Sequence, residues 1–381
     1  MRFRCLSPAF IVVLVALTLA AALLRAGPVH ATQIVVGQVG PLSGREAAQS
    51  GAYSAGMRLH FDALNKMGGV NGHTFALVHK NDRGSAEDTV ALTKQMIVED
   101  RPLVLAGYFG SKNIADLVAS GLLETNRIAL VGYRVAEIRP EVPYLYNVRA
   151  GLRDEIYKLT EHLATIGITR LGLLHEDAPG SPVLVAAAEA AAQKARVTLT
   201  VRASYAANTA NVVGAVDKFI KHPPQAILIL SNGAAAAAFV EKYRTSGGTA
   251  QLLAHSGADM EQLSRRLADE HMRSLVIAQV TPSPYKISSR LTKEFNDALS
   301  KAAAIETPVS YAMMEGYIAA RVIAEAVRRL GSNPSRWGIV SALDSINDFD
   351  VGGYQIGYRP GQRSGSQFVE LTIVGAGGIR R

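Results

Sequence analysis

The chain has 381 residues, a formal net charge of +8 and a single cysteine, Cys5. Its positive residues are dispersed, with no Lys/Arg block and no basic stripe interleaved with aromatics, which argues against nucleic-acid binding. Because Cys5 lies in the segment expected to be removed, the exported chain has no thiol, and disulfides, cysteine metal sites and thiol nucleophiles are excluded.

Residues 1–31 have the pattern of a secretory signal peptide. Arg2 and Arg4 precede an apolar stretch from 9 to 24, and Val29 and Ala31 supply small residues before a cleavage site. The stretch is shorter than a comfortable membrane span, which disfavours an N-terminal anchor. We therefore expect cleavage after Ala31, no later membrane insertion, and residence in a bacterial periplasm, where a large core replaces disulfides.

Apolar, β-branched runs then recur along the chain with stretches long enough for a helix between most of them. A helix is expected from about Ala47 to the glycines at 68 and 69. Residues 85–88 resemble a capping box, and Val212, Val216 and Ile220 step by four like one face of a helix. The runs predicted as strands are 34–39, 75–79, 103–106, 128–131, 171–175, 197–201, 226–230 and 275–280.

Continuous apolar strands separated by helices indicate parallel sheets covered on both faces, so the predicted fold class is α/β, doubly wound. The units fall into two series, from 34 to about 148 and from about 152 to 280. A mainly helical stretch follows, from 291 to about 343, and a hairpin is expected from 354–358 and 368–374. With no Pro/Ser-rich linker, we expect two lobes joined by short crossings.

Signatures of catalysis are missing from the sequence. It contains no G-x-x-x-x-G-K-[ST], H-E-x-x-H or G-x-S-x-G pattern, and no histidine pair spaced for a metal. His79, His175 and His255 fall at or near strand ends, and we expect them to be partly buried and hydrogen-bonded. The sequence therefore predicts a protein that is not an enzyme and that needs no metal or cofactor.

The turns that follow the strands are more informative, because ligands of open α/β sheets bind beyond the carboxyl ends of the strands. These turns are rich in glycine, serine and aromatics, which allow close backbone approach, hold a carboxylate and supply an apolar wall. The turns of the first series include Ser43, then Tyr108, Phe109, Gly110 and Ser111, then Gly132, Tyr133 and Arg134. The alternative for the aromatics is a plug that packs between loops.

The chain resembles a known family at several points. The segments IVVGQVGPLSG, NKMGGVNG, DTVALTKQMIVED, LAGYFGS and YAMMEGYIAARVIAEAV are similar to the leucine/isoleucine/valine-binding-protein-like solute receptors of bacterial ABC transporters. The resemblance implies a type I periplasmic binding fold: two Rossmann-like lobes, three hinge crossings and a ligand in the cleft. It also implies discontinuous lobes, with 32–150 and 281–347 in the first and 151–280 and 348–381 in the second.

The family's ligand contacts carry over to this sequence turn by turn. The resemblance implies a carboxylate grip at 108–111, a second contact turn at 132–134, and Gln49 covering the ligand. In the second lobe it points to Ser181 and Asn232. Amino-acid receptors of this family hold the ligand ammonium with an acid where this chain has Ser256, so an organic carboxylate competes with an α-amino acid as the ligand.

The sequence thus predicts a periplasmic receptor that delivers an amino acid or related carboxylate to an ABC transporter permease by hinge closure. One alternative is a receptor of the same fold that passes its closed state to a membrane signalling protein. A second alternative is a secreted α/β hydrolase, against which the missing nucleophile turn argues.

Overall fold

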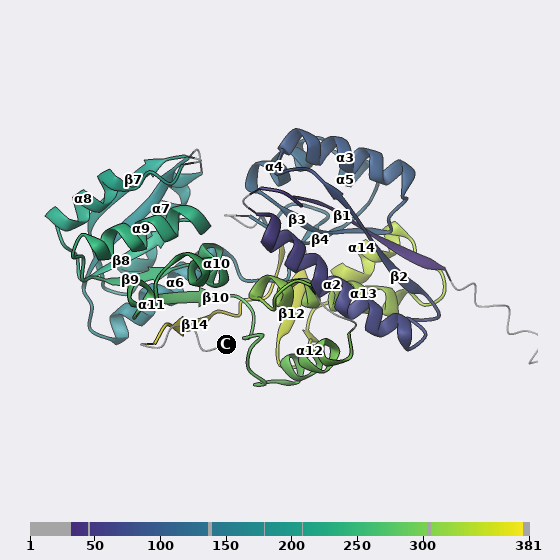
Figure 1. Cartoon of the computed structure of the whole chain (residues 1–381). Coiled ribbons are helices and arrows are strands. Elements are labelled where there is room, and N and C mark those ends of the chain that lie inside the picture. The colour runs from purple at the N-terminus through teal and green to yellow at the C-terminus, as the bar shows by residue number, and fades with distance from the viewer. Residues whose placement is uncertain are drawn as a thin grey trace, which may run out of the picture.

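Two sheets, each covered by helices, form two lobes that lie side by side and are joined at the centre of the molecule (Figure 1). The computed structural model describes residues 32–375 except 45, 136–138, 179, 208 and 303–305. The predicted signal peptide, residues 1–31, lies outside the described residues. The predicted α/β class with two doubly wound lobes is confirmed.

The first sheet is parallel and has the order β2-β1-β3-β4-β5. One of its faces packs on helices α2, α13 and α14, and the other packs on α3, α4 and α5. Its strands are β1 (Gln33–Gly40), β2 (Thr74–Asn81), β3 (Val104–Phe109), β4 (Leu130–Arg134) and β5 (Leu145–Tyr146). Its helices are α2 (Ala47–Lys66), α3 (Ala86–Glu99), α4 (Ser111–Ala119), α5 (Leu122–Thr125), α12 (Arg290–Lys301), α13 (Tyr311–Leu330) and α14 (Arg336–Asp344).

The second sheet has the order β14-β10-β9-β8-β6-β7, in which only the edge strand β14 is antiparallel. Helices α6 and α7 cover one face, and α8 to α11 cover the other. Its strands are β6 (Arg170–Asp177), β7 (Thr198–Ala206), β8 (Ala226–Leu230), β9 (Gln251–Ala254), β10 (Val276–Gln279) and β14 (Glu370–Ile373). Its helical elements are α6 (Leu152–Thr165), α7 (Ser181–Lys194), α8 (Val213–Lys221), α9 (Gly233–Thr245), η1 (Ser256–Ala258), α10 (Met260–Arg266) and α11 (Asp269–Met272).

Each apolar run predicted as a strand overlaps an observed strand, but two short strands of the two lobe sheets were not predicted. β5 has two residues and β9 has four, and neither is long enough to stand out from the surrounding sequence. The predicted cap at residue 85 is confirmed, since the Ser85 hydroxyl accepts a hydrogen bond from the Asp88 N–H at 3.2 Å. At α8, the N-cap residue Val212 and Val216 are buried as the spacing predicted, whereas Ile220 is 39% exposed.

The chain crosses between the lobes three times, after β5, after β10 and before β14. The expected pairing of 354–358 with 368–374 is wrong: β12 (Gln355–Arg359) pairs with β11 (Phe349–Asp350) and β13 (Gln362–Gly365), while β14 pairs with β10. The cause is the third crossing, which separates the two segments.

The division of the chain into lobes stays our proposal, with one amendment to the expected boundary. Val351, Tyr354, Ile356 and Tyr358 are buried in the same cluster as the first sheet and α13. We therefore assign 349–365 to the first lobe and only the segment around β14 to the second.

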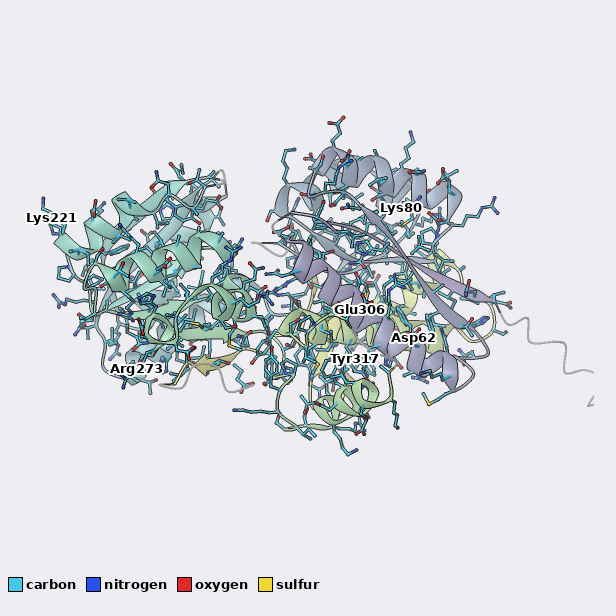
Figure 2. The ribbon with its side chains drawn as sticks, in the orientation of Figure 1. Asp62, Lys80, Lys221, Arg273, Glu306 and Tyr317 are labelled. Carbon is cyan, nitrogen blue, oxygen red and sulfur yellow. The ribbon has the colours of Figure 1, made fainter. Side chains whose placement is uncertain are left out.

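Charged side chains are spread over the molecular surface, as Asp62 on the first lobe and Lys221 and Arg273 on the second illustrate (Figure 2). Among the described residues, no helix combines the length and apolar character that a membrane span requires. This dispersed charge agrees with the sequence, which has no continuous basic stripe.

Candidate functional site

Apart from the added edge strand β14, the two sheets share one strand order, which places a topological switch point in each lobe. In the first lobe the order reverses between β1 and β3, and in the second between β6 and β8. Ser43 and Ser111 follow β1 and β3, and Ser181 and Asn232 follow β6 and β8. Because ligands of doubly wound sheets bind at such points, the topology places four of the predicted residues where binding turns belong.

A recess lies where the lobes meet, and both lobes line it. The first lobe contributes Arg134 at the end of β4 and Glu315 on α13. The second contributes Ser256 and Asp259 after β9, and Val280 follows β10 at the second crossing. The recess is therefore built at the carboxyl ends of strands from both sheets.

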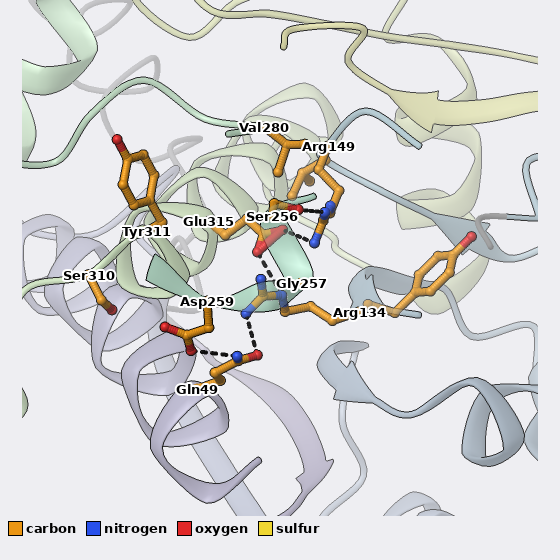
Figure 3. A network of polar contacts seen from close by, with 12 residues as sticks. Gln49, Arg134, Arg149, Ser256, Gly257, Asp259, Val280, Ser310, Tyr311 and Glu315 are labelled. Carbon is orange, nitrogen blue, oxygen red and sulfur yellow. Dashed lines mark hydrogen bonds and ion pairs between the residues drawn. The ribbon is translucent and has the colours of Figure 1, made fainter. Parts of the chain in front are cut away.

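Arg134 was expected in a ligand-contact turn, and the structure shows that its guanidinium group already has partners within the protein (Figure 3). Its Nε lies 3.0 Å from the Glu315 carboxylate, and its Nη1 donates to Gln49 Oε1 at 2.7 Å. Gln49 Nε2 in turn donates to Asp259 Oδ2 at 2.5 Å. Gln49 and Arg134, both predicted site residues, are thus brought together, and Gln49 links the first lobe to the second.

A buried chain of alternating charges continues from Glu315 toward the second lobe. The guanidinium group of Arg149, in the first crossing, lies 3.2 Å from Glu315 and 3.0 Å from Glu155 on α6. The side chains of these three residues are at most 9% exposed. Burial raises the pKa of Glu155, and Arg149 together with the bonds from Ser256 opposes that rise. Because three donor groups face the carboxylate, we assign it as ionised at neutral pH.

Ser256 occupies the position where amino-acid receptors have an acid for the ligand ammonium. In this chain its groups are instead bonded to Glu155 and Arg149. Its N–H donates to Glu155 Oε2 at 2.6 Å, its hydroxyl donates to Glu155 Oε1 at 3.0 Å, and Arg149 donates to the hydroxyl. An acid is also present nearby, because Asp259 stands three residues later and faces the recess. The lack of an acid at 256 is therefore no evidence against a ligand with an N–H donor.

Tyr108 and Tyr133 were expected to wall a ligand, and the structure places both in the core. Each side chain is at most 1% exposed and packs beneath α3 and α4, and the Tyr108 hydroxyl lies 3.1 Å from Thr93 Oγ1. The strands extend through these residues instead of turning before them. For these two rings, packing in the core is the correct reading.

Phe109 and Gly132 lie on the other face of the same strands and support the recess indirectly. The Phe109 ring meets Tyr53 edge to face, with centroids 5.9 Å apart, and lies 5.9 Å from the Arg134 guanidinium carbon. Gly132 has φ of 70°, and a Cβ there would lie 2.0 Å from the Tyr53 hydroxyl. Glycine is required because the Tyr53 side chain lies against the strand.

The remaining predicted residues lie at the strand ends. Ser43 is exposed after β1, and Ser111 is exposed at the start of α4. Gly110 precedes α4 as a cap without a side chain and donates its N–H to Arg134 O at 3.0 Å. Ser181 is engaged locally, since its hydroxyl donates to Glu176 O. Asn232 is exposed and occupies the N-cap position of α9, without a side-chain cap bond.

Sequence reasoning missed Arg149, Glu155, Asp259 and Glu315. A usable signal existed for Glu315, which stands among apolar residues on the buried face of α13, where an acid needs a partner. No comparable signal marked Arg149 or Glu155, because their partners are distant in the chain. Within the described residues, no group of three His, Cys, Asp or Glu side chains is placed to hold a metal ion.

His255 lies beside this network and is 7% exposed. Its Nδ1 accepts a hydrogen bond from the Gly257 N–H at 3.1 Å. The pKa of His255 is lowered from 6.5 to about 4, mainly by burial and also by the Arg149 and Arg134 charges, while a bond with the Ser231 backbone acts in the opposite direction. The imidazole is therefore neutral in the folded protein at physiological pH.

This neutral histidine makes stability depend on pH. The unfolded chain binds a proton at His255 near pH 6.5, and the folded chain does so only near pH 4. The contribution of neutral His255 to the free energy of unfolding is therefore complete above pH 6.5 and is lost as the pH falls toward 4. We expect the difference in the free energy of unfolding between the native protein and His255→Gln to be constant above pH 7. Below pH 6.5 we expect this difference to shrink by at most about 1.4 kcal/mol per pH unit. Urea unfolding at several pH values measures it. The exposed His222→Gln serves as control, and a difference that does not change with pH would contradict the prediction.

Comparisons with known proteins agree with this geometry. A family model described as periplasmic binding protein matches residues 33–376. A substrate-binding periplasmic protein from Ralstonia solanacearum is 36% identical, with a TM-score of 0.83 over 91% of this chain and 98% of that one. A Leu/Ile/Val-binding protein homolog from Brucella melitensis is 24% identical over 91% of this chain and 88% of its own. A branched-chain amino acid ABC transporter protein from Thermus thermophilus with bound valine is 14% identical, with a TM-score of 0.79 over 91% of this chain and 94% of that one.

Proposed function

This chain belongs to the periplasmic binding protein family, and from that premise we propose that it is a solute receptor for a bacterial ABC importer. It binds an amino acid or a related small carboxylate between its lobes and performs no catalysis. Closure of the lobes about the three crossings creates the surface that the membrane permease recognises. After cleavage of residues 1–31, the receptor works in the periplasm.

The observation that carries this proposal is the recess lined from both lobes. Its walls include Arg134 and Glu315 from the first lobe and Ser256 and Asp259 from the second. A ligand that touches both sets of residues stabilises the closed arrangement more than the open one, and this difference in affinity drives closure. The Gln49–Asp259 hydrogen bond already joins the lobes at this place.

A ligand screen tests the proposal directly. Amino acids, amides and aliphatic and aromatic carboxylates are scanned by thermal shift and then by calorimetry. A ligand present at a hundred times its dissociation constant stabilises the folded protein by about 2.7 kcal/mol, which raises the melting temperature measurably. We expect the same ligand to reduce the radius of gyration in small-angle scattering. Turnover of a bound compound, or binding without any change in radius, would contradict the receptor function.

A second test concerns the proposed anion grip at the start of α4. Gly110 gives this helix no side-chain cap, which supports a role for its first N–H groups, together with Ser111, in holding an anionic group. Ser111→Ala removes one hydrogen bond to a charged group, and we expect roughly ten- to a hundredfold weaker binding. Ser120→Ala, at the other end of the same helix, is the control and should bind normally. Unchanged affinity in Ser111→Ala would move the ligand away from this turn.

A further inference from the structure

The Gln49 side chain bridges the two lobes as a small bound amide would (Figure 3). Its carbonyl oxygen accepts from Arg134 Nη1 at 2.7 Å, and its amide nitrogen donates to Asp259 Oδ2 at 2.5 Å. A single carboxamide therefore spans the space between a donor of the first lobe and an acceptor of the second. Gln49 is half-buried on the first turn of α2.

The other bonds of these two partners come from their own lobes. Arg134 Nε is paired with Glu315, so its guanidinium charge is already balanced. Asp259 caps α10, with Oδ1 accepting from the Gln262 N–H at 2.9 Å and Oδ2 accepting from Gln262 Nε2 at 3.1 Å. Each lobe thus directs toward Gln49 one hydrogen-bonding group, an N–H from the first and a carboxylate oxygen from the second.

The charges around the recess disfavour an anion in the place of the Gln49 amide. The described side chains in and directly behind the recess include four carboxylates but only two guanidinium groups. A ligand carboxylate at this place would face the Asp259 carboxylate without a proton to donate and would add repulsion. A bare ammonium could not accept the bond from Arg134. The acids are Glu155, Asp259, Glu261 and Glu315, and the arginines are Arg134 and Arg149.

We propose that the ligand carries a primary carboxamide or a ureido group that displaces the Gln49 amide and takes its two hydrogen bonds, to Arg134 and to Asp259. Gln49 is thereby an internal occupant of the site in the unliganded receptor. This inference rests on the proposed solute-binding function and narrows its ligand class. It leaves the other end of the ligand free to meet the start of α4.

Matched pairs of compounds test this inference on the full receptor. Glutamine with glutamate, asparagine with aspartate, and nicotinamide with nicotinate differ only by a carboxamide against a carboxylate, and simple amino acids, urea and aliphatic carboxylates complete the panel. Calorimetry with each compound is expected to show carboxamide members binding about tenfold or more tightly than their carboxylate partners. Carboxylates or simple amino acids that bind as well as every carboxamide would overturn the inference and leave the receptor function standing. No binding of any compound, by the native chain or by Gln49→Ala, would overturn both.

Two variants distinguish a ligand that displaces the Gln49 side chain from a ligand that binds beside it and contacts it. Gln49→Ala removes the internal occupant, and we expect carboxamides to bind more tightly to it than to the native chain. Asp259→Asn keeps a residue type that caps helices and tolerates the positive φ of 57°, but its loss of charge should weaken carboxamide binding about tenfold and reduce the preference over carboxylates. Gln193→Ala, on an exposed position of α7, is the matched control. Weaker carboxamide binding in Gln49→Ala would show that Gln49 is a ligand contact and would overturn the displacement.

Discussion

Replacement of Arg149 by methionine is expected to lower the free energy of unfolding by about 3–5 kcal/mol. The guanidinium group lies between Glu155 and Glu315, at 3.0 and 3.2 Å, and both carboxylates are at most 2% exposed. Methionine fills a similar volume but leaves two buried acids without their common partner. A buried charge that loses its partner must be desolvated without compensation or become protonated, and both cost free energy.

Equilibrium unfolding in urea measures this loss, with Lys158→Met on α6 as the control. Lys158 pairs with Glu161 at 3.2 Å, but both side chains are about half exposed, at 47% and 49%. We expect the control to change stability by no more than about 1 kcal/mol. A loss in Arg149→Met as small as that in the control would mean that the two acids do not depend on Arg149 in the folded protein.

Replacement of Gly316 by alanine is expected to lower the free energy of unfolding by at least about 2 kcal/mol, through overpacking between two helices. A Cβ at Gly316 on α13 would lie 2.0 Å from the Tyr53 backbone oxygen on α2. A Cβ at Gly56 on α2 would likewise lie 1.9 Å from the Met313 backbone oxygen. Because the clash is with backbone, only separation of the helices relieves it. That separation also displaces Glu315, so we expect ligand affinity to fall as well.

Gly51→Ala provides a matched control on the same helix as Gly56. An added Cβ at Gly51 has no atom within 4 Å, so the substitution should stabilise the protein by about 0.5–1 kcal/mol through the lower flexibility of the unfolded chain. Thermal and urea unfolding of Gly51→Ala, Gly56→Ala and Gly316→Ala measure the contrast. If all three variants change stability by the same amount, α2 and α13 do not approach as closely as the structure shows.

The positions of four predicted residues could be derived from the sequence because they depend on where strands end. Ser43, Ser111, Ser181 and Asn232 follow the strands that flank the two switch points, and each strand was visible as an apolar run. The side of the sheet toward which the Tyr108 and Tyr133 rings point was not predictable in the same way. Positive φ angles at Gly107 and Gly132 interrupt the alternation of side chains just before these residues, so counting along the strand misplaces them.

The sequence by itself determined the α/β class, the positions of most strands along the chain and several helix ends. Apolar spacing and caps depend on neighbours only a few residues away. Ser85 is such a case, since its partner is three residues along the chain. Only the tertiary structure decided that Arg134, Arg149 and Glu315 meet, or that β14 adds to the edge of the second sheet. These contacts depend on the three crossings between the lobes. No local spacing records them, because a charged residue far along the chain becomes a partner only after both sheets have formed.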